Sequence, residues 1–246
     1  MRIALMSDIH ANREAFEACL AHARAGGVER FVFLGDFVGY GADPEWVLDT
    51  VMDLTAKGAV AVAGNHDRAA VSERGGMSAD ATYAVGWTRS RLTQGMREFV
   101  ERLPLEVEED DRLYVHADAS APEKWRYVSD AEMAAQSLAA ARARVTFVGH
   151  VHVPMLYGIT ATQKLMRFKP VPGEPIPLLR QRRWLGVLGS VGQPRDGDPA
   201  AAYSTYDTAA GDLVCHRVAY DVLAASAKIR AAGLPAILAD RLFEGR

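Results

Sequence analysis

Five short runs of apolar residues recur along the N-terminal part of the sequence, and each is about as long as a β-strand. They occupy residues 3–6, 31–34, 59–63, 113–115 and 145–148. The runs show little polar alternation, as expected for strands that are covered on both faces. This pattern predicts a β-sheet buried between other elements.

Helices are expected between the first three runs. In the first interval, apolar residues recur every three or four positions until Gly26 ends the pattern. The second helix begins with Asp43 as a capping residue and Pro44 at the first helical position, and Gly58 closes it. The resulting order, β-α-β-α-β, is typical of a parallel sheet.

Residues 71–104 depart from this alternation and predict a helical insertion. Its second half carries an apolar stripe at helical spacing that Pro104 ends, formed by Met96, Phe99, Val100 and Leu103. Upstream, Tyr83 and Trp87 stand one helical turn apart. Stacking on a nucleobase is one interpretation of these two rings, and packing in a helix core is favoured.

The C-terminal part of the chain combines predicted hairpins with predicted helices. Ser129 and Glu132 resemble a capping box for a helix that runs to about Ala141. Residues 153–218 are rich in proline and glycine, which predicts β-hairpins and turns, and residues 222–232 predict a last helix.

The domain organisation is expected to be simple. The sequence contains no linker, internal repeat or low-complexity tract. We therefore expect one domain over residues 1–246, with the helical insertion at about 71–104.

Composition and charge narrow the class of protein. Hydrophobic residues make up 49% and charged residues 24%, close to the averages of globular domains, which excludes disordered and collagen-like chains. The net charge of −3 predicts no stable binding to nucleic acid or to an anionic membrane. The N-terminal apolar run is too short for a signal peptide, and the two cysteines form no motif. These features together predict a cytoplasmic protein.

Histidine and acidic residues follow the apolar runs. The segments are Asp8-Ile9-His10, Gly35-Asp36, Gly64-Asn65-His66-Asp67, His116 and Gly149-His150-Val151-His152. Each segment alone is compatible with an ordinary loop. The carboxyl ends of strands form the ligand crevice of open α/β sheets, so these residues are expected to converge. Imidazole, carboxylate and amide ligands without thiolate are typical of Mn²⁺, Fe or Zn²⁺ sites.

The order of these motifs resembles that of the calcineurin-like metallophosphoesterases. The family pattern is Asp-x-His, Gly-Asp, Gly-Asn-His-Asp/Glu, a lone His and Gly-His-x-His, and every part of it occurs between residues 1 and 152. Residues 35–41 and 189–195 are similar to the small bacterial and archaeal branch of the family, whereas residues 153–185 match nothing in it. The resemblance implies an α/β fold with two packed mixed β-sheets flanked by helices, a four-layer α/β/β/α sandwich.

The resemblance also implies roles for the strand-end residues. Two divalent metal ions are expected: one held by Asp8, His10 and His152, the other by Asn65, His116 and His150, with Asp36 shared between them. His66 is expected to act as a general acid or as a hydrogen-bond donor to the phosphoryl group. Asp67 is expected to orient a histidine, and an ordinary turn residue is the alternative. Arg195 could reach a substrate phosphate, but a surface arginine beside Asp196 is favoured.

The implied function is metal-dependent hydrolysis of a phosphoester, with a metal-bridging hydroxide as the nucleophile. A phosphatase is slightly favoured over a phosphodiesterase, and a nucleotide is one possible small-molecule substrate. A catalytically weak protein-binding scaffold on the same fold is the alternative. Retention of His66 and of every ligand position favours the enzyme. The sequence leaves the oligomeric state open.

Overall fold

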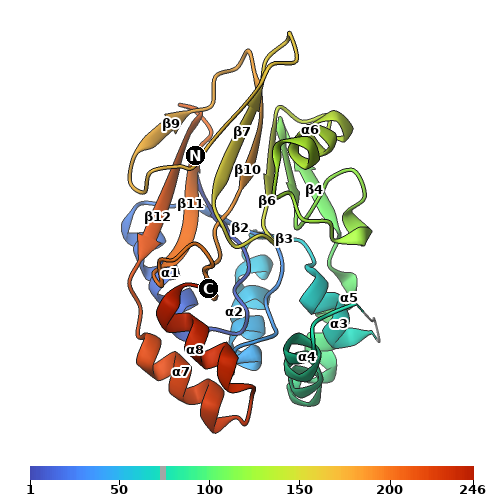
Figure 1. Cartoon of the computed structure of the whole chain (residues 1–246), viewed down its shortest axis with the longest axis vertical. Helices are drawn as coiled ribbons and strands as arrows, with labels where there is room; N and C mark the ends of the chain where they lie inside the picture. The colour runs from blue at the N-terminus through green and yellow to red at the C-terminus, as the bar shows by residue number, and fades with distance from the viewer. Residues whose placement is uncertain (73–75) are drawn as a thin grey trace.

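Two six-stranded β-sheets face each other in the computed structural model, which describes residues 1–72 and 76–246 (Figure 1). The first sheet contains, in spatial order, β3 (Val60–Ala61), β2 (Arg30–Phe33), β1 (Arg2–Met6), β11 (Ala201–Asp207), β12 (Asp212–Val218) and β9 (Pro175–Pro177). The second contains β4 (Glu106–Glu109), β5 (Arg112–Val115), β6 (Val145–Val148), β10 (Arg183–Val187), β7 (Met155–Ile159) and β8 (Leu165–Phe168).

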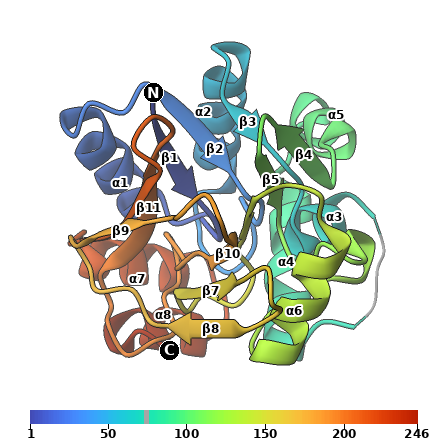
Figure 2. The same cartoon turned by 90° about the horizontal axis from the view of Figure 1, so that it is seen from above.

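Helices cover the outer faces of both sheets (Figure 2). On the first sheet lie α1 (Arg13–Ala25) and α2 (Pro44–Ala56), and on the second lies α6 (Ala131–Ala140). The remaining helices are α3 (Asn65–Val71), α4 (Ala79–Arg91), α5 (Gln94–Arg102), α7 (Val222–Ala231) and α8 (Ala236–Glu244), with a short 3-10 turn at Pro122–Lys124. The expected α/β class with two packed mixed sheets is therefore confirmed.

Each sheet contains three parallel strands, at one side of the first sheet and in the centre of the second. Strands β1, β2 and β3 run parallel, as the β-α-β-α-β pattern predicted, and β5, β6 and β10 do the same in the second sheet. The C-terminal hairpin β11–β12 joins the first sheet through an antiparallel pairing of β11 with β1. Both parallel sets present their carboxyl ends at the same edge of the molecule.

Alternate residues of β1 enter two different cores. Ile3 and Leu5 pack between the sheets, whereas Ala4 and Met6 face the layer of helices. All four side chains are fully buried. Because successive side chains of a strand point to opposite faces, a strand covered on both sides reads as a continuous apolar run.

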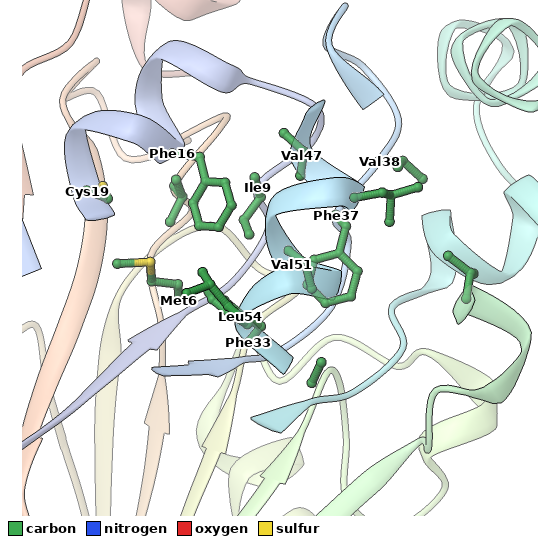
Figure 3. Packing of buried hydrophobic residues seen from close by; sticks show 14 of the residues in the cluster. Met6, Ile9, Phe16, Cys19, Phe33, Phe37, Val38, Val47, Val51 and Leu54 are labelled. Atoms are coloured by element: carbon green, nitrogen blue, oxygen red, sulfur yellow. The ribbon is translucent and has the colours of Figure 1, made fainter. Parts of the chain in front are cut away.

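The core beneath α1 and α2 is organised around aromatic rings (Figure 3). The ring of Phe33, at the end of β2, contacts those of Phe16 and Phe37 edge to face, with centroids 5.7 and 6.4 Å apart. Phe33 lies three residues before Asp36, so this cluster anchors the strand end that carries one of the predicted ligands.

The predicted N-cap position is confirmed for α2 and wrong by one residue for α6. Asp43 stands at the start of α2 but makes no capping hydrogen bond, because its carboxylate instead accepts from Lys228 Nζ at 2.8 Å. Asp130, not Ser129, caps α6, since its carboxylate accepts from two N–H groups at once, those of Glu132 and Met133. Helices α3 and α8 were not predicted.

The segment 71–104 contains α4 and α5 within the described residues; residues 73–75 lie outside them. Val85, Met96 and Val100 are buried in the same cluster as the helical face of the first sheet. The core position expected for the two rings of α4 is wrong for Tyr83, which is 57% exposed, whereas Trp87 packs partly buried. That this segment is an insertion into the domain stays a prediction.

Among the described residues, every helix is too short or too polar to span a bilayer.

Replacement of Phe33 by alanine is expected to lower the free energy of unfolding by about 3–5 kcal/mol, because it leaves a cavity in a fully buried cluster. Phe243→Ala is the matched control, since Phe243 is 46% exposed and truncating it should change stability by no more than about 0.5 kcal/mol. Urea unfolding of the two variants measures the difference. Similar losses in both would contradict the anchoring role of the aromatic cluster.

Candidate metal centre

The loops that follow β1, β2, β5 and β6 are joined by main-chain hydrogen bonds beyond the ends of the strands. The N–H of Asp8 donates to Gly35 O at 3.0 Å, and that of Gly149 donates to His116 O at 2.9 Å. Strand β1 is central to this arrangement, because the segment after β10 also binds it, with Val191 N donating to Ser7 O at 3.0 Å. All five predicted strand-end motifs therefore lie at one edge of the two sheets.

Two motif glycines are required by this close approach. A Cβ on Gly64 would lie 2.1 Å from Asp36 Oδ1, and one on Gly149 would lie 1.8 Å from Ser7 Oγ. No side chain fits at either position without moving the loop opposite it. The glycines of Gly-Asn-His-Asp and Gly-His-x-His thus allow carboxylate and imidazole groups from different strands to meet.

Asp8, His10 and His152 form the first group of potential ligands. Their ligand atoms lie within 4.8 Å of one another, and all three side chains are buried. His152 Nε2 lies 3.2 Å from Asp8 Oδ1 and 3.1 Å from His10 Nε2. The main-chain N–H of His150 donates to both carboxylate oxygens of Asp8 and holds this carboxylate in place.

Asp36, His116 and His150 form the second group, with the same 4.8 Å limit on their ligand atoms. His116 Nε2 lies 3.2 Å from His150 Nδ1 and 3.3 Å from Asn65 Oδ1. The amide oxygen of Asn65 therefore faces the same point as the two rings.

The Asp36 carboxylate lies between the two groups. Its Oδ2 is 3.7 Å from His10 Nε2 and 3.4 Å from His116 Nε2. Its Oδ1 accepts a hydrogen bond of 2.8 Å from the main-chain N–H of His66, which fixes the orientation of the carboxylate.

The outward-facing ring nitrogens of the four histidines define their tautomers. Nδ1 of His10, His116 and His152 bonds to the carbonyl oxygens of Val38, Leu34 and Gln193, and Nε2 of His150 bonds to that of Trp125. A carbonyl only accepts, so the bonded nitrogen carries the proton and the neutral ring directs a lone pair inward. Two such lone pairs facing each other at 3.1 Å, on His10 and His152, repel unless a cation lies between them. The donor set fits a divalent metal.

Burial and charge set the protonation of these rings. Burial lowers the pKa of His150 to about 3 and that of His10 well below its usual value, so both rings are neutral. Burial also lowers the pKa of His116, but the Asp36 carboxylate outweighs it and brings that pKa to about 9. A cation that binds this group therefore competes with a proton on His116.

Backbone strain is concentrated at the same residues. Asp8, His10, Asp36, His150 and His152 all have φ between 50° and 66°. This left-handed region is uncommon for residues with a side chain, and each such residue costs about 1–3 kcal/mol. Packing elsewhere in the fold offsets this free-energy cost. The strained residues are those whose side chains must converge as ligands.

The match to known proteins agrees with this geometry. A family model described as the calcineurin-like phosphoesterase superfamily domain matches residues 1–211. The chain belongs to this superfamily. Membership confirms the resemblance carried by the motifs and the expectation of a phosphoric ester hydrolase, and the family implies divalent metal ions.

Relatives of this calcineurin-like phosphoesterase cover its full length. An uncharacterised protein of Methanocaldococcus jannaschii is 33% identical over 99% of this chain and 98% of its own. The crystal structure of a metallophosphoesterase from Sphaerobacter thermophilus is 36% identical, with a TM-score of 0.89 over 100% of this chain and 99% of its own. A hypothetical protein of Pyrococcus horikoshii, 17% identical with a TM-score of 0.79 over 100% and 98%, shares the fold.

His66 lies beside the potential ligands in this calcineurin-like phosphoesterase. Its ring contacts those of Tyr40 and His10, with centroids 4.4 and 4.9 Å away, and its buried Nδ1 has no hydrogen-bond partner within the described residues. Burial lowers the pKa of His66 to about 4. A ring nitrogen of His66 also lies within 4.8 Å of ligand atoms of His10 and Asp36. The geometry therefore permits a ligand role besides the predicted catalytic one.

Asp67 does not orient a histidine in the described part of the chain, which corrects the predicted role. Its carboxylate accepts from four main-chain N–H groups, those of Gly64, Asp36, Phe37 and Val38, at 2.8–3.3 Å. Burial, reinforced by the Asp36 carboxylate, raises the pKa of Asp67 to about 7, against the lowering effect of these donors. Asp67 therefore holds the β2 loop, and with it Asp36, against the start of α3.

A pocket of about 740 Å³ opens beside the centre, with Asn65, His66 and His150 in its wall. Its aromatic lining is Tyr40, Trp125 and Tyr127, and the Tyr127 ring stacks on His150 with centroids 4.0 Å apart. Trp125 and Tyr127 were not predicted as site residues, because the loop after His116 has no periodicity. The two rings of α4, Tyr83 and Trp87, are not among the described lining residues.

Asp67→Asn is expected to weaken metal binding by about 10–100-fold, because an amide cannot accept from all the N–H groups that position the Asp36 loop. The metal affinity can be measured by competition with a chelating dye. Asp53→Asn is the control, since Asp53 is an exposed residue of α2 that pairs with Lys57. Unchanged affinity in a folded Asp67→Asn protein would show that the loop keeps its conformation without this carboxylate.

Proposed function

We propose that this protein hydrolyses phosphoesters at a two-metal centre. The observation that supports two ions rather than one is the position of Asp36 Oδ2, 3.7 Å from His10 Nε2 and 3.4 Å from His116 Nε2. A carboxylate that faces two sets of inward lone pairs can serve both sets, as the bridging group of a two-metal hydrolase does.

The proposed ligands are those that the sequence predicted. One cation would be held by Asp8, His10 and His152, the other by Asn65, His116 and His150, with Asp36 common to both. Nitrogen and oxygen donors without sulfur suit Mn²⁺, Fe or Zn²⁺. When bound, such cations would supply a water acidic enough to attack phosphorus as hydroxide near neutral pH, and positive charge to offset that of the phosphoryl oxygens.

The protein's own contribution is to orient these groups before the substrate arrives. The carbonyl groups of Val38, Leu34 and Gln193 fix three rings, and the main-chain N–H groups of His150 and His66 fix Asp8 and Asp36. Because ligand orientation is set by main chain and by buried packing, little reorganisation accompanies reaction.

His66 is proposed to assist the leaving group. It lies at the wall of the pocket beside Asn65, packed between the rings of His10 and Tyr40. A side chain at this place can reach a phosphoester bound at the proposed centre. With a pKa of about 4 the free ring is neutral and donates a hydrogen bond from its N–H, and it can give a proton to the departing oxygen when the negative charge of the bound ester raises that pKa.

Several finer predictions belong to this proposal. A phosphomonoester is slightly favoured over a diester, a nucleotide is a possible substrate, manganese is one candidate metal and the cytoplasm is the predicted location. We also propose that residues 1–246 act as one domain with an insertion at about 71–104. The non-catalytic scaffold is disfavoured because the donor set is oriented and all of it except the half-buried Asn65 is buried.

The purified protein is expected to bind about two divalent ions per chain after reconstitution with Mn²⁺. Elemental analysis measures the stoichiometry. Asp36→Asn should weaken both sites, because its carboxylate is shared, whereas His10→Ala should chiefly weaken one. One ion or fewer in the unaltered protein would mean that Asp36 does not bridge.

His66→Ala is expected to keep both metals and to lower turnover of an alkyl phosphate by about 10²–10⁴-fold, because a poor leaving group needs a proton in the transition state. Nitrophenyl phosphate should be affected much less, since its leaving group departs as a stable phenolate. Equal losses on both esters would instead assign His66 to stabilisation of the phosphoryl group. Loss of metal would make His66 a ligand.

A further inference from the structure

Two arginines from distant parts of the chain line the pocket that opens onto the proposed metal centre. Arg195 lies in the loop between β10 and β11, and Arg241 belongs to α8. Neither has a carboxylate partner within the described residues. The pocket therefore carries positive charge that the fold itself does not neutralise.

Arg195 is held in position without being neutralised. Its Nε and Nη2 donate to Gln193 Oε1 at 3.2 and 2.7 Å, and its guanidinium lies 5.7 Å from the centre of the Tyr40 ring. Its neighbour in sequence, Asp196, does not neutralise it, because Asp196 pairs with Lys169, at 2.9 Å, and with Arg217. Arg195 is partly exposed, as a surface arginine would be, but it lies in the lining of the pocket. An amide and an aromatic ring orient the guanidinium but leave its charge available.

Arg241 has a donor that the surrounding protein does not satisfy. Its Nε is buried and lacks a hydrogen-bond partner within the described residues, although the side chain as a whole is half-buried. A buried donor of a charged group without an acceptor costs about 1–3 kcal/mol or more. The unpaired Nε leaves the charge of Arg241 without an acceptor in the described protein, and the outer part of the guanidinium lines the pocket, where an anion can reach it.

The fold ties the two arginines to each other. The N–H of Gly197 donates to Gly245 O at 3.0 Å, so the end of α8 rests on the loop that carries Arg195. A Cβ on Gly245 would lie 2.7 Å from the main chain of Asp198, and its φ is 63°, which glycine tolerates. On its apolar side α8 packs with Leu238 and Leu242 in a cluster that Tyr40 also contacts. Helix α8 is therefore a fixed wall of the pocket.

The other charged residues of the described lining cancel each other, so the two arginines set the sign of the pocket. Lys124 and the single acid Glu123 lie in its lining, opposite the potential metal ligands Asn65 and His150. The phosphoester that reacts would bind at the proposed centre, on the side of the pocket where Asn65 and His150 lie. The guanidinium groups are then left for another anionic group, and their planar fork matches the oxygens of a phosphate or carboxylate.

We propose that Arg241 and Arg195 form a second anion-binding position in the pocket, which selects phosphoesters that carry a further phosphate or carboxylate. This inference rests on the proposed function for the reaction at the metal centre. It gives a recognition role to helix α8, which lies beyond the residues 1–211 that the family model matches.

The test compares unbranched α,ω-alkanediol bisphosphates of increasing chain length with the corresponding monophosphates. In the unaltered, metal-loaded protein, one range of chain lengths should raise kcat/KM of the bisphosphate by about 10–100-fold over the monophosphate, beyond the doubling that two equivalent ends give. In Arg241→Gln the ratio of kcat/KM for the bisphosphate to kcat/KM for the monophosphate should fall to the doubling that two equivalent ends give. Arg246→Gln is the matched control, because Arg246 is exposed and pairs with Glu244 at 3.2 Å, and it should keep the ratio.

A series of ω-phosphooxyalkanoates distinguishes a phosphate from a carboxylate as the second group. Equal kcat/KM for bisphosphates and monophosphates at every length would overturn the proposal, as would a preference that survives Arg241→Gln. Calorimetry can compare the binding of alkane disulfonates with that of monosulfonates. This comparison tests the same anion-binding position without turnover. Tighter binding of the disulfonate that Arg241→Gln abolishes would support the anion position even if every ester proved inert, and inert esters would count against the proposed function alone.

Discussion

Four of the five buried histidines of the site, all except His66, donate one ring N–H to a main-chain carbonyl, and the geometry of the site depends on this constraint. Three of the carbonyl groups belong to the segments that follow strands, Leu34 and Val38 after β2 and Gln193 after β10, whereas that of Trp125 follows the 3-10 turn. Ligand direction is thus set by strand position, not by side-chain packing alone. With every outer nitrogen committed, the inner nitrogens point lone pairs at one another and at two carboxylates. A buried arrangement of this kind is stable only with a cation or an extra proton to share.

Holding such groups together is costly in the backbone as well. The left-handed residues of the site, Asp8 and Asp36 among them, persist because sheets on both sides fix the loops that contain them. Both faces of β1 pack in apolar cores, which fixes the loop that carries Asp8. The aromatic cluster at Phe33 fixes the loop that carries Asp36. Asp67 adds a third restraint by accepting from the N–H groups of the Asp36 loop. The free energy gained by packing the cores offsets the cost of the strained backbone at the carboxyl edge of the sheets.

The strands and the potential ligands could be predicted because their signals are local. A run buried on both faces lacks polar alternation, and a motif such as Gly-His-x-His keeps its order wherever the strands lie. The partners of Asp67 could not be predicted, since four main-chain donors leave no trace in sequence. Arg241 was missed for a similar reason. Helix α8 is short, and its place at the pocket depends on the hydrogen bond between Gly245 and Gly197, which no local sequence pattern indicates. Asp130 displaced Ser129 as a cap because a carboxylate reaches two N–H groups at once.

The shared direction of the parallel strands has a consequence for engineering. With the chemistry confined to the carboxyl edge, the turns at the opposite edge carry none of it. The turn between β4 and β5 at Asp110 and the turn between β11 and β12 at Gly211 lie side by side around a separate cavity there. Exposed turns of this kind tolerate added sequence well. They are the natural positions for a reporter domain, a surface anchor or new chain termini, because such additions leave the register of every ligand-bearing strand untouched.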